Sequence, residues 1–220
     1  MAAPRLPANL ALLLLLLLAA IVLIQVGLVR VAFDRLGLSE SSAVLLLISS
    51  LAGSAINLPL FTLTATPPAQ PLPPPLRLGF LRLPEYHGKT LIALNVGGAL
   101  IPLCFSLYLL LNNPLPFGDV LLGIGLVAII GRLFSRPIQG LGIGIPILIA
   151  PLAAALAALL INPMQSAPLA YISGTLGVVI GADLLRLKAI RQLGVPLAAI
   201  GGAGTFDGVF ITGIVAVLLT

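Results

Sequence analysis

The chain has 220 residues, of which 60% are hydrophobic and 8% are charged, and its mean hydropathy is +1.22. A soluble domain carries about 25% charged residues, so a soluble fold would leave this chain with far too much apolar surface. The net charge of +5 comes without a Lys/Arg cluster interleaved with aromatic residues, and Trp is absent, which argues against nucleic-acid binding. With one cysteine, Cys104, and one histidine, His87, the chain forms no internal disulfide and no metal or haem site with several histidines. We therefore predict an all-α integral membrane protein without a metal or cofactor, whose main partner is the lipid bilayer.

The hydrophobic runs predict about seven transmembrane helices, because one crossing needs about 20 apolar residues. They lie at residues 10–31, 43–63, 90–111, 120–134, 143–161, 169–187 and 197–219. Arg5 before the first run is typical of a signal peptide, but the run continues through "IVLIQVGLV" and no A-x-A cleavage site follows it. We therefore expect the first helix to be retained rather than cleaved. For the fourth and seventh segments, a re-entrant segment is the alternative to a full crossing.

The distribution of basic residues predicts the orientation. If the seven helices alternate in direction, nine of the 11 basic residues fall on the side of the N-terminus, and only Arg30 and Arg35 fall on the other. Cytoplasmic loops are enriched in Lys and Arg. We therefore expect a cytoplasmic N-terminus and an external C-terminus.

One long loop divides the chain. The segment "TATPPAQPLPPPLRLGFLRLPEYHG", residues 64–88, is rich in proline, which disfavours helix and favours extended polyproline II. We interpret it as a semi-rigid cytoplasmic linker, with a docking site for a partner as the weaker alternative. The expected organisation is an N-terminal helix pair at 1–63, a linker at 64–89 and a five-helix core at 90–220.

Two of the six acidic residues lie inside apolar segments, where a charge is costly and usually functional. Asp183 is three residues before Arg186 on the sixth helix, so a local salt bridge is the alternative to a functional role. At about 100° per residue, Asp183 points nearly opposite the small residues of the same helix, Ser173, Gly177 and Gly181.

Asp207 lies in "GGAGTFDG", whose glycines predict that the last helix is broken or begins late, with Thr205 as its cap. An aspartate in that first turn is stabilised by the helix dipole. Asp183 and Asp207 enter from the cytoplasmic side on consecutive helices, so we expect them to meet. A polar membrane site around Asp207 would also include Asn95, Tyr171, Gly204 and Thr205. For Asn95, an interhelical hydrogen bond is the alternative.

Four segments carry a resemblance to a known family: "ALNVGGALIPL", "SRPIQGLGIGIP", "AYISGTLGVVIGADLL" and "IGGAGTFDGVFITGIVAVLL". In this order they resemble a family of prokaryotic multi-pass membrane proteins catalogued as domain of unknown function sixteen-fourteen. The resemblance covers residues 90–220. It implies a bacterial or archaeal cell (inner) membrane and brings no established activity.

A looser resemblance concerns chemistry. Two carboxylates that share a proton form the catalytic pair of presenilin-type and prepilin-type intramembrane aspartyl proteases, which Asp183 and Asp207 loosely resemble. In those proteases the second aspartate follows a Gly-x-Gly-Asp pattern. Here Asp183 lacks the glycine directly before it, and Phe206 precedes Asp207. The Pro-Ala-Leu motif of the presenilin type is also absent.

Three functions remain open from the sequence. The first is a carrier-like site at Asp183 and Asp207 that binds a proton, a cation or a small solute. No clear inverted repeat is present, so a homodimer is one way to supply a second half. The second is an intramembrane di-aspartyl peptidase with Asp183 and Asp207 as catalytic residues. The third is a non-catalytic assembly or structural factor.

Overall fold

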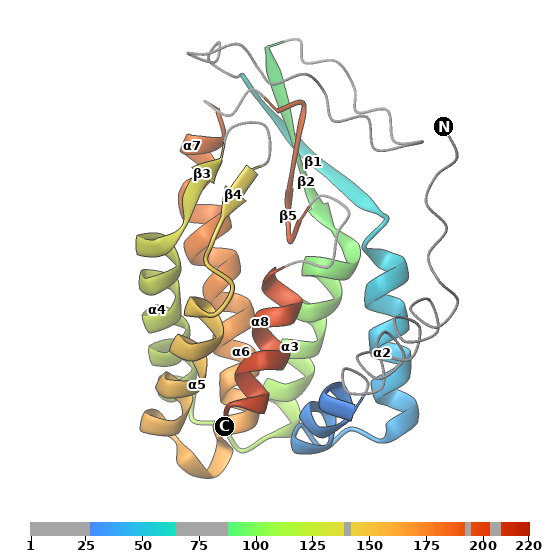
Figure 1. Ribbon diagram of the computed structural model, residues 1–220, viewed down its shortest axis with the longest axis vertical. Coiled ribbons are helices and arrows are strands. Elements are labelled where there is room, and N and C mark those ends of the chain that lie inside the picture. The colour runs from blue at the N-terminus through green and yellow to red at the C-terminus, as the bar shows by residue number, and fades with distance from the viewer. Residues whose placement is uncertain (1–26, 65–87, 139–141, 192–194, 203–207) are drawn as a thin grey trace, which may run out of the picture.

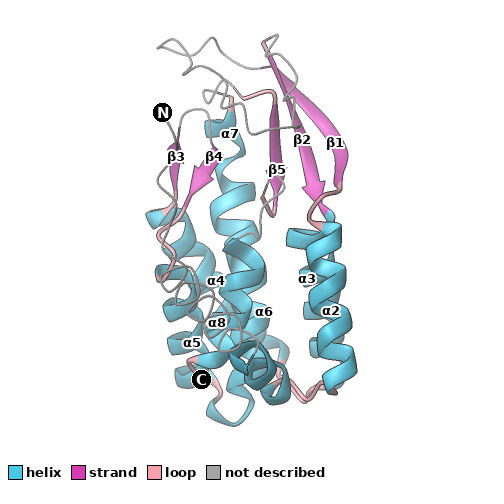
Figure 2. Cartoon of the chain, turned by 45° about the vertical axis from the view of Figure 1, so that its right-hand side comes forward, coloured by secondary structure: helices cyan, strands magenta, loops and turns pink. Residues whose placement is uncertain are grey.

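The computed structural model describes residues 27–64, 88–138, 142–191, 195–202 and 208–220. These residues form a layer of helices that carries a small β-sheet and a short hairpin at one end, here called the sheet end (Figures 1 and 2). The mostly helical character predicted from composition is confirmed. The prediction of a purely α-helical chain is wrong, because the described residues include five strands.

The helices run alternately toward and away from the sheet end, and the C-terminus lies at the opposite end (Figure 1). In chain order they are α2 (Glu40–Gly53), α3 (Ile101–Asn112), α4 (Phe117–Phe134), α5 (Ile149–Ile161), α6 (Ser166–Val178), α7 (Leu187–Ile190) and α8 (Gly208–Leu218). A short 3₁₀ turn, η2 (Pro163–Gln165), precedes α6. Two further segments, the π turn η3 (Val179–Asp183) and the 3₁₀ turn η4 (Leu184–Arg186), join α6 to α7.

Among the described residues, two helices are long and apolar enough to cross a membrane, namely α4 and the continuous helix Pro163–Ile190, with 18 and 28 residues. At 1.5 Å per residue α4 is about 27 Å long, close to the roughly 30 Å of a bilayer's hydrocarbon core. A third candidate is the pair Gly27–Arg35 and α2, which is bent by 114°. These two or three candidate spans indicate a membrane protein, and they are fewer than the seven crossings predicted.

The sheet has the order β1-β2-β5. β1 (Asn57–Thr64) is antiparallel to β2 (Lys89–Asn95), and β5 (Leu197–Ile200) is parallel to β2. The separate hairpin consists of β3 (Arg136–Ile138) and β4 (Gly142–Gly144). All five strands lie at the sheet end (Figure 2).

Four of the expected helices therefore contain strand residues. The second predicted span ends in β1, the third begins in β2, the fifth begins in β4, and the seventh begins in β5. Uniformly apolar runs carry neither a 3.6-residue nor a two-residue period, so the pattern cannot separate buried strand from helix. Pro59, inside β1, is the residue that disfavours a helix there.

The long helix around α6 is the centre of the helical layer, and ten of the 13 residues of α6 are buried. Its small residues face α4. A side chain added at Gly177 would meet Val127, and one added at Gly181 would meet the main chain of Ala128. Such close backbone approach is typical of helix packing in lipid, where packing rather than hydrophobicity drives association.

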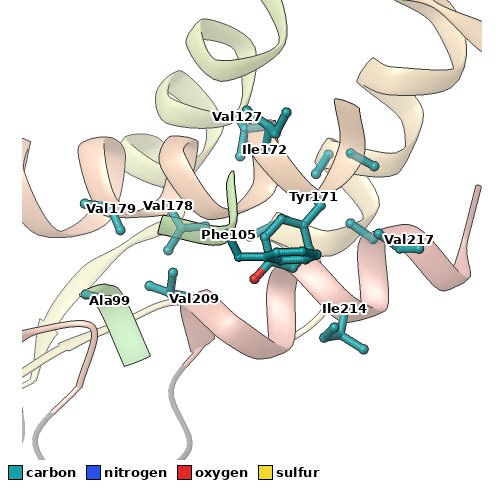
Figure 3. Packing of buried hydrophobic residues seen from close by; sticks show 14 of the residues in the cluster. Ala99, Phe105, Val127, Tyr171, Ile172, Val178, Val179, Val209, Ile214 and Val217 are labelled. Carbon is teal, nitrogen blue, oxygen red and sulfur yellow. The ribbon is translucent and has the colours of Figure 1, made fainter. Parts of the chain in front are cut away.

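A second contact surface of α6 carries Tyr171, which is fully buried (Figure 3). Its ring meets Phe105 of α3 edge-on, with centroids 4.9 Å apart. Gly213 of α8 packs so closely on Tyr171 that an added side chain would collide with the ring. α6 is thus enclosed by α4, α3 and α8. At the sheet end it continues into η3.

Candidate functional site

Asp183 is the last residue of the π turn η3, at the point where the long helix reaches the sheet end. π turns contain one more residue per turn than an α-helix and often occur at functional sites. The carboxylate is half-buried, and its Oδ2 accepts a hydrogen bond of 3.2 Å from the main-chain N–H of Gly201. Asp183 therefore contacts the segment that follows β5.

A cavity of about 100 Å³ lies beside this carboxylate. Its walls come from β2, β4, η3, α7, β5 and the turn after β5, and they consist of Ile92, Gly142, Ile143, Asp183, Ile190, Leu197, Ala198, Ala199, Ile200 and Gly202. Among these described lining residues, Asp183 carries the only charge. Since one water occupies about 30 Å³ of liquid, the cavity has room for roughly three waters or a small hydrated ion.

The turn after β5 is built from glycines because its backbone is left-handed. Gly201 and Gly202 have φ angles of 79° and 86°, which residues with side chains rarely adopt. Gly201 also packs against Gly98 and Ala99, so that an added side chain would meet the main chain of η1 (Val96–Leu100). These glycines position the N–H that donates to Asp183. In the sequence they form the run "IGGAG", from which only a break in the last helix was predicted.

Among the residues that the structure describes, Arg186 does not form the local salt bridge that was the alternative to a functional role for Asp183. Its Nη2 donates to the carbonyl oxygens of Arg132 and Ser135, both at 2.7 Å, and its Nε donates to Ser135 Oγ at 3.1 Å. The guanidinium thus satisfies carbonyl groups at the C-terminal end of α4, where the helix dipole favours a cation.

Asn95 lies at the junction of β2 and η1 and is fully buried. Its Oδ1 accepts from Gly98 N–H at 2.7 Å, and its Nδ2 donates to Ser54 O at 2.7 Å and to Asn57 Oδ1 at 3.0 Å. Asn95 is not among the residues that line the cavity. Asn95 therefore forms structural hydrogen bonds, as the alternative to a role in the site predicted. These bonds connect the sheet to two helix ends instead of connecting two helices.

Tyr171 also lies away from the cavity, deep in the helical layer. Its hydroxyl and that of Thr175, one turn further along α6, have no geometrically sound hydrogen-bond partner among the described residues. The tight contact of Gly213 with both side chains leaves no room for a ligand beside them.

Gly204, Thr205 and Asp207 lie outside the described residues, so the expected meeting of Asp183 and Asp207 stays a prediction. The described chain stops at Gly202, a residue of the cavity wall, and resumes at Gly208, the first residue of α8. Asp207 therefore directly precedes α8 in the sequence. Within the described ranges, no group of three or more His, Cys, Asp or Glu side chains could hold a metal ion.

Apolar helices of membrane-crossing length, joined to a small sheet around a carboxylate-lined cavity, indicate a helical membrane protein. The chain belongs to the family described as "Protein of unknown function (DUF1614)", whose model matches residues 51–219. This confirms the family inferred from the four segments. No curated protein and no solved structure matches the chain, so no comparison supports the likeness to presenilin-type or prepilin-type proteases.

Proposed function

We propose that this chain is a multi-pass inner-membrane protein of a prokaryotic cell, with the sheet end in the cytoplasm, and that Asp183 belongs to a carrier-like site for a proton or a small cation. Asp207, which directly precedes α8 in the sequence, is the second carboxylate in this proposal. The observation that carries the proposal is the cavity beside Asp183, whose described walls offer one carboxylate and otherwise apolar or glycine residues.

The orientation is supported by the charges. Of the described basic residues, Arg30 and Arg35 belong to the helix before α2, away from the sheet, whereas the other six belong to the sheet end: Lys89, Arg132, Arg136, Arg186, Lys188 and Arg191. This bias agrees with a cytoplasmic sheet end.

Seven crossings require the shorter helices to lie in the membrane as well. Their outward side chains support this. Leu111 of α3 is 76% exposed, and Leu160 of α5 is 83% exposed. Apolar side chains with such exposure on helices beside α4 and α6 are suited to contact with lipid.

The chemistry of the site follows from its electrostatics. A carboxylate removed from bulk water gains from a proton or a cation, because either one offsets the cost of burying the charge. The main-chain N–H of Gly201 holds this carboxylate in place beside the cavity. An acidic side chain fixed at a membrane-embedded cavity is a typical element of a proton or cation pathway.

The test uses the full-length protein in proteoliposomes that contain a pH-sensitive dye, with Na⁺ or K⁺ gradients as the driving force. The wild type should move protons or cations, and the Asp183→Asn and Asp207→Asn variants should abolish the movement at equal protein content. The matched control is Asp119→Asn, at the opposite end of α4, where Asn162 Nδ2 donates to Asp119 Oδ2 at 2.9 Å. An Asp183→Asn variant as active as the wild type contradicts the proposal.

An intramembrane di-aspartyl peptidase is the second candidate. The observation that favours it is the position of β5, which is at the edge of the sheet and lines the cavity beside Asp183. An edge strand can accept an extended peptide by strand addition. In a deletion strain, this function predicts membrane-protein cleavage products that the wild-type gene restores and that neither Asp183→Asn nor Asp207→Asn restores. If both variants restore the wild-type phenotype in full, the aspartates have only a packing role, as expected of a structural or assembly factor.

A further inference from the structure

Three arginines come together where α4 ends. Arg132 is in the last turn of α4, Arg136 is the first residue of β3, and Arg186 reaches across from η4. The hydrogen bonds from Arg186 to the carbonyl oxygens of Arg132 and Ser135 bring its guanidinium to the main chain between Arg132 and Arg136. We call Arg132, Arg136 and Arg186 the arginine cluster.

The three members of the cluster have different roles. The Nε and Nη2 groups of Arg186 donate hydrogen bonds to Arg132 and Ser135 at the end of α4, so Arg186 mainly positions the end of that helix. The side chains of Arg132 and Arg136 are exposed. Within the described part of the chain, neither forms an ion pair with a carboxylate, and the one ion pair found there joins Arg30 to Glu40 near the opposite end. Among the described residues, the exposed side chains of the cluster are therefore cationic without a paired carboxylate.

Exposed apolar residues are the sequence neighbours of Arg132 and Arg186. Leu133 and Phe134 follow Arg132 and are 70% and 47% exposed, and Leu185 precedes Arg186 and is 55% exposed. The cluster also marks one end of an 18-residue candidate span. A cationic site bordered by apolar side chains at this level fits a molecule with an anionic head and hydrocarbon tails.

We propose that the arginine cluster binds the headgroup phosphate of an anionic phospholipid, with its acyl chains along Leu133, Phe134 and Leu185. Arginine suits this task because its planar guanidinium donates two parallel hydrogen bonds to a phosphate. The positive charge selects an anionic lipid over a zwitterionic one. The apolar border selects a lipid over free phosphate, which gains nothing from it. The site is separate from the Asp183 cavity, since none of these residues lines it.

The experiment measures lipid retained by the purified full chain in detergent, by native mass spectrometry, during titration with phosphatidylglycerol or phosphatidylcholine. The wild type should retain phosphatidylglycerol preferentially. The double variant Arg132→Gln/Arg136→Gln should bind it about 30-fold more weakly, the share expected for two cationic side chains near an anionic surface. Its binding of phosphatidylcholine should not change.

Arg191→Gln is the control, because it removes one arginine charge at the same end, beside Ile190, which is buried. It should retain the preference. The charge-conserving double variant Arg132→Lys/Arg136→Lys should also prefer phosphatidylglycerol, but bind it more weakly than the wild type, because lysine does not donate two parallel hydrogen bonds. Equal binding of both lipids by the wild type overturns the proposal. It is also overturned if Arg191→Gln loses as much as the double variant, or if inorganic phosphate displaces phosphatidylglycerol from the wild type.

Discussion

The main-chain N–H of Gly201 donates a hydrogen bond of 3.2 Å to the carboxylate of Asp183, which is 18 residues earlier in the chain. This bond joins the end of the sheet to the end of the longest helix. Gly201 also packs against the main chain of η1, which leads into α3. Gly201 therefore contacts both the carboxylate at the cavity and the start of α3.

The first prediction concerns Gly201. Gly201→Ala places a side chain at a φ of 79°, where it meets Ala99, so both the backbone conformation and the packing are disturbed. We expect the variant to lose about 2 kcal/mol of stability or more, most of it from the left-handed backbone. Thermal unfolding in detergent measures this loss.

Gly125→Ala is its control, because nothing lies within 4 Å of the position where that side chain would be built, on α4. Alanine favours a helix over glycine by about 1 kcal/mol, so this variant should be neutral or stabilised. If both variants lower the unfolding temperature equally, the contact at Gly201 has no special role.

The second prediction concerns the contact between α6 and α4. A side chain at Gly181 would collide with the main chain of Ala128, which cannot turn away as a flexible side chain would. Gly181→Ala should therefore separate the two helices and destabilise the protein by about 1 to 3 kcal/mol, the usual cost of overpacking. A thermal unfolding temperature equal to that of the wild type would show that the helices are less closely packed than described.

The third prediction concerns Asn95. Asn95→Ala removes three hydrogen bonds at once and leaves the N–H of Gly98 buried without its acceptor. At about 1 kcal/mol per bond, we expect a loss of about 3 kcal/mol. Asn113→Ala, which removes a single side-chain bond to Leu109 O, should cost about 1 kcal/mol or less. Because Asn95 lies outside the cavity wall, activity per folded molecule should not change. A folded Asn95→Ala protein without activity would instead assign Asn95 to the site.

The fourth prediction tests the orientation. In a Cys104→Ser background, which has no other cysteine, Lys188→Cys should react with a membrane-impermeant maleimide only from the cytoplasmic side. Asn112→Cys, at the last residue of α3 at the opposite end, should react only from outside. Labelling of intact cells and of inverted vesicles separates the two cases. Reaction of both positions from the same side contradicts the proposed topology.

The sequence predicted the helices best where they were long and unbroken. The fourth and sixth predicted segments, 120–134 and 169–187, fall inside α4 and the helix Pro163–Ile190. The prediction that Asp183 points away from the glycine face also agrees with the structure, since the glycines face α4 and Asp183 lines the cavity. The regular spacing of about 100° per residue is only an approximation here, because the π turn η3 lies between Gly177 and Asp183.

What the sequence could not give is the contact between distant segments. The sheet depends on pairing of Asn57 with Asn95 and of Leu91 with Leu197, and no local pattern specifies such partners. The same holds for Arg186, whose nearest acidic residue in sequence suggested a salt bridge, whereas the carbonyl groups of another helix take its donors. Sequence spacing predicted Asp183 as the partner of Arg186, whereas its observed partners belong to the end of α4.

The π turn η3 has a consequence for the register of the whole helix. A π turn contains about one residue more than an α-helical turn, so the direction of Asp183 relative to the residues before η3 depends on the winding of that turn. A one-residue deletion between Val179 and Asp183 would remove none of the residues that line the cavity. Such a deletion therefore separates the contribution of the winding of η3 from that of the aspartate itself.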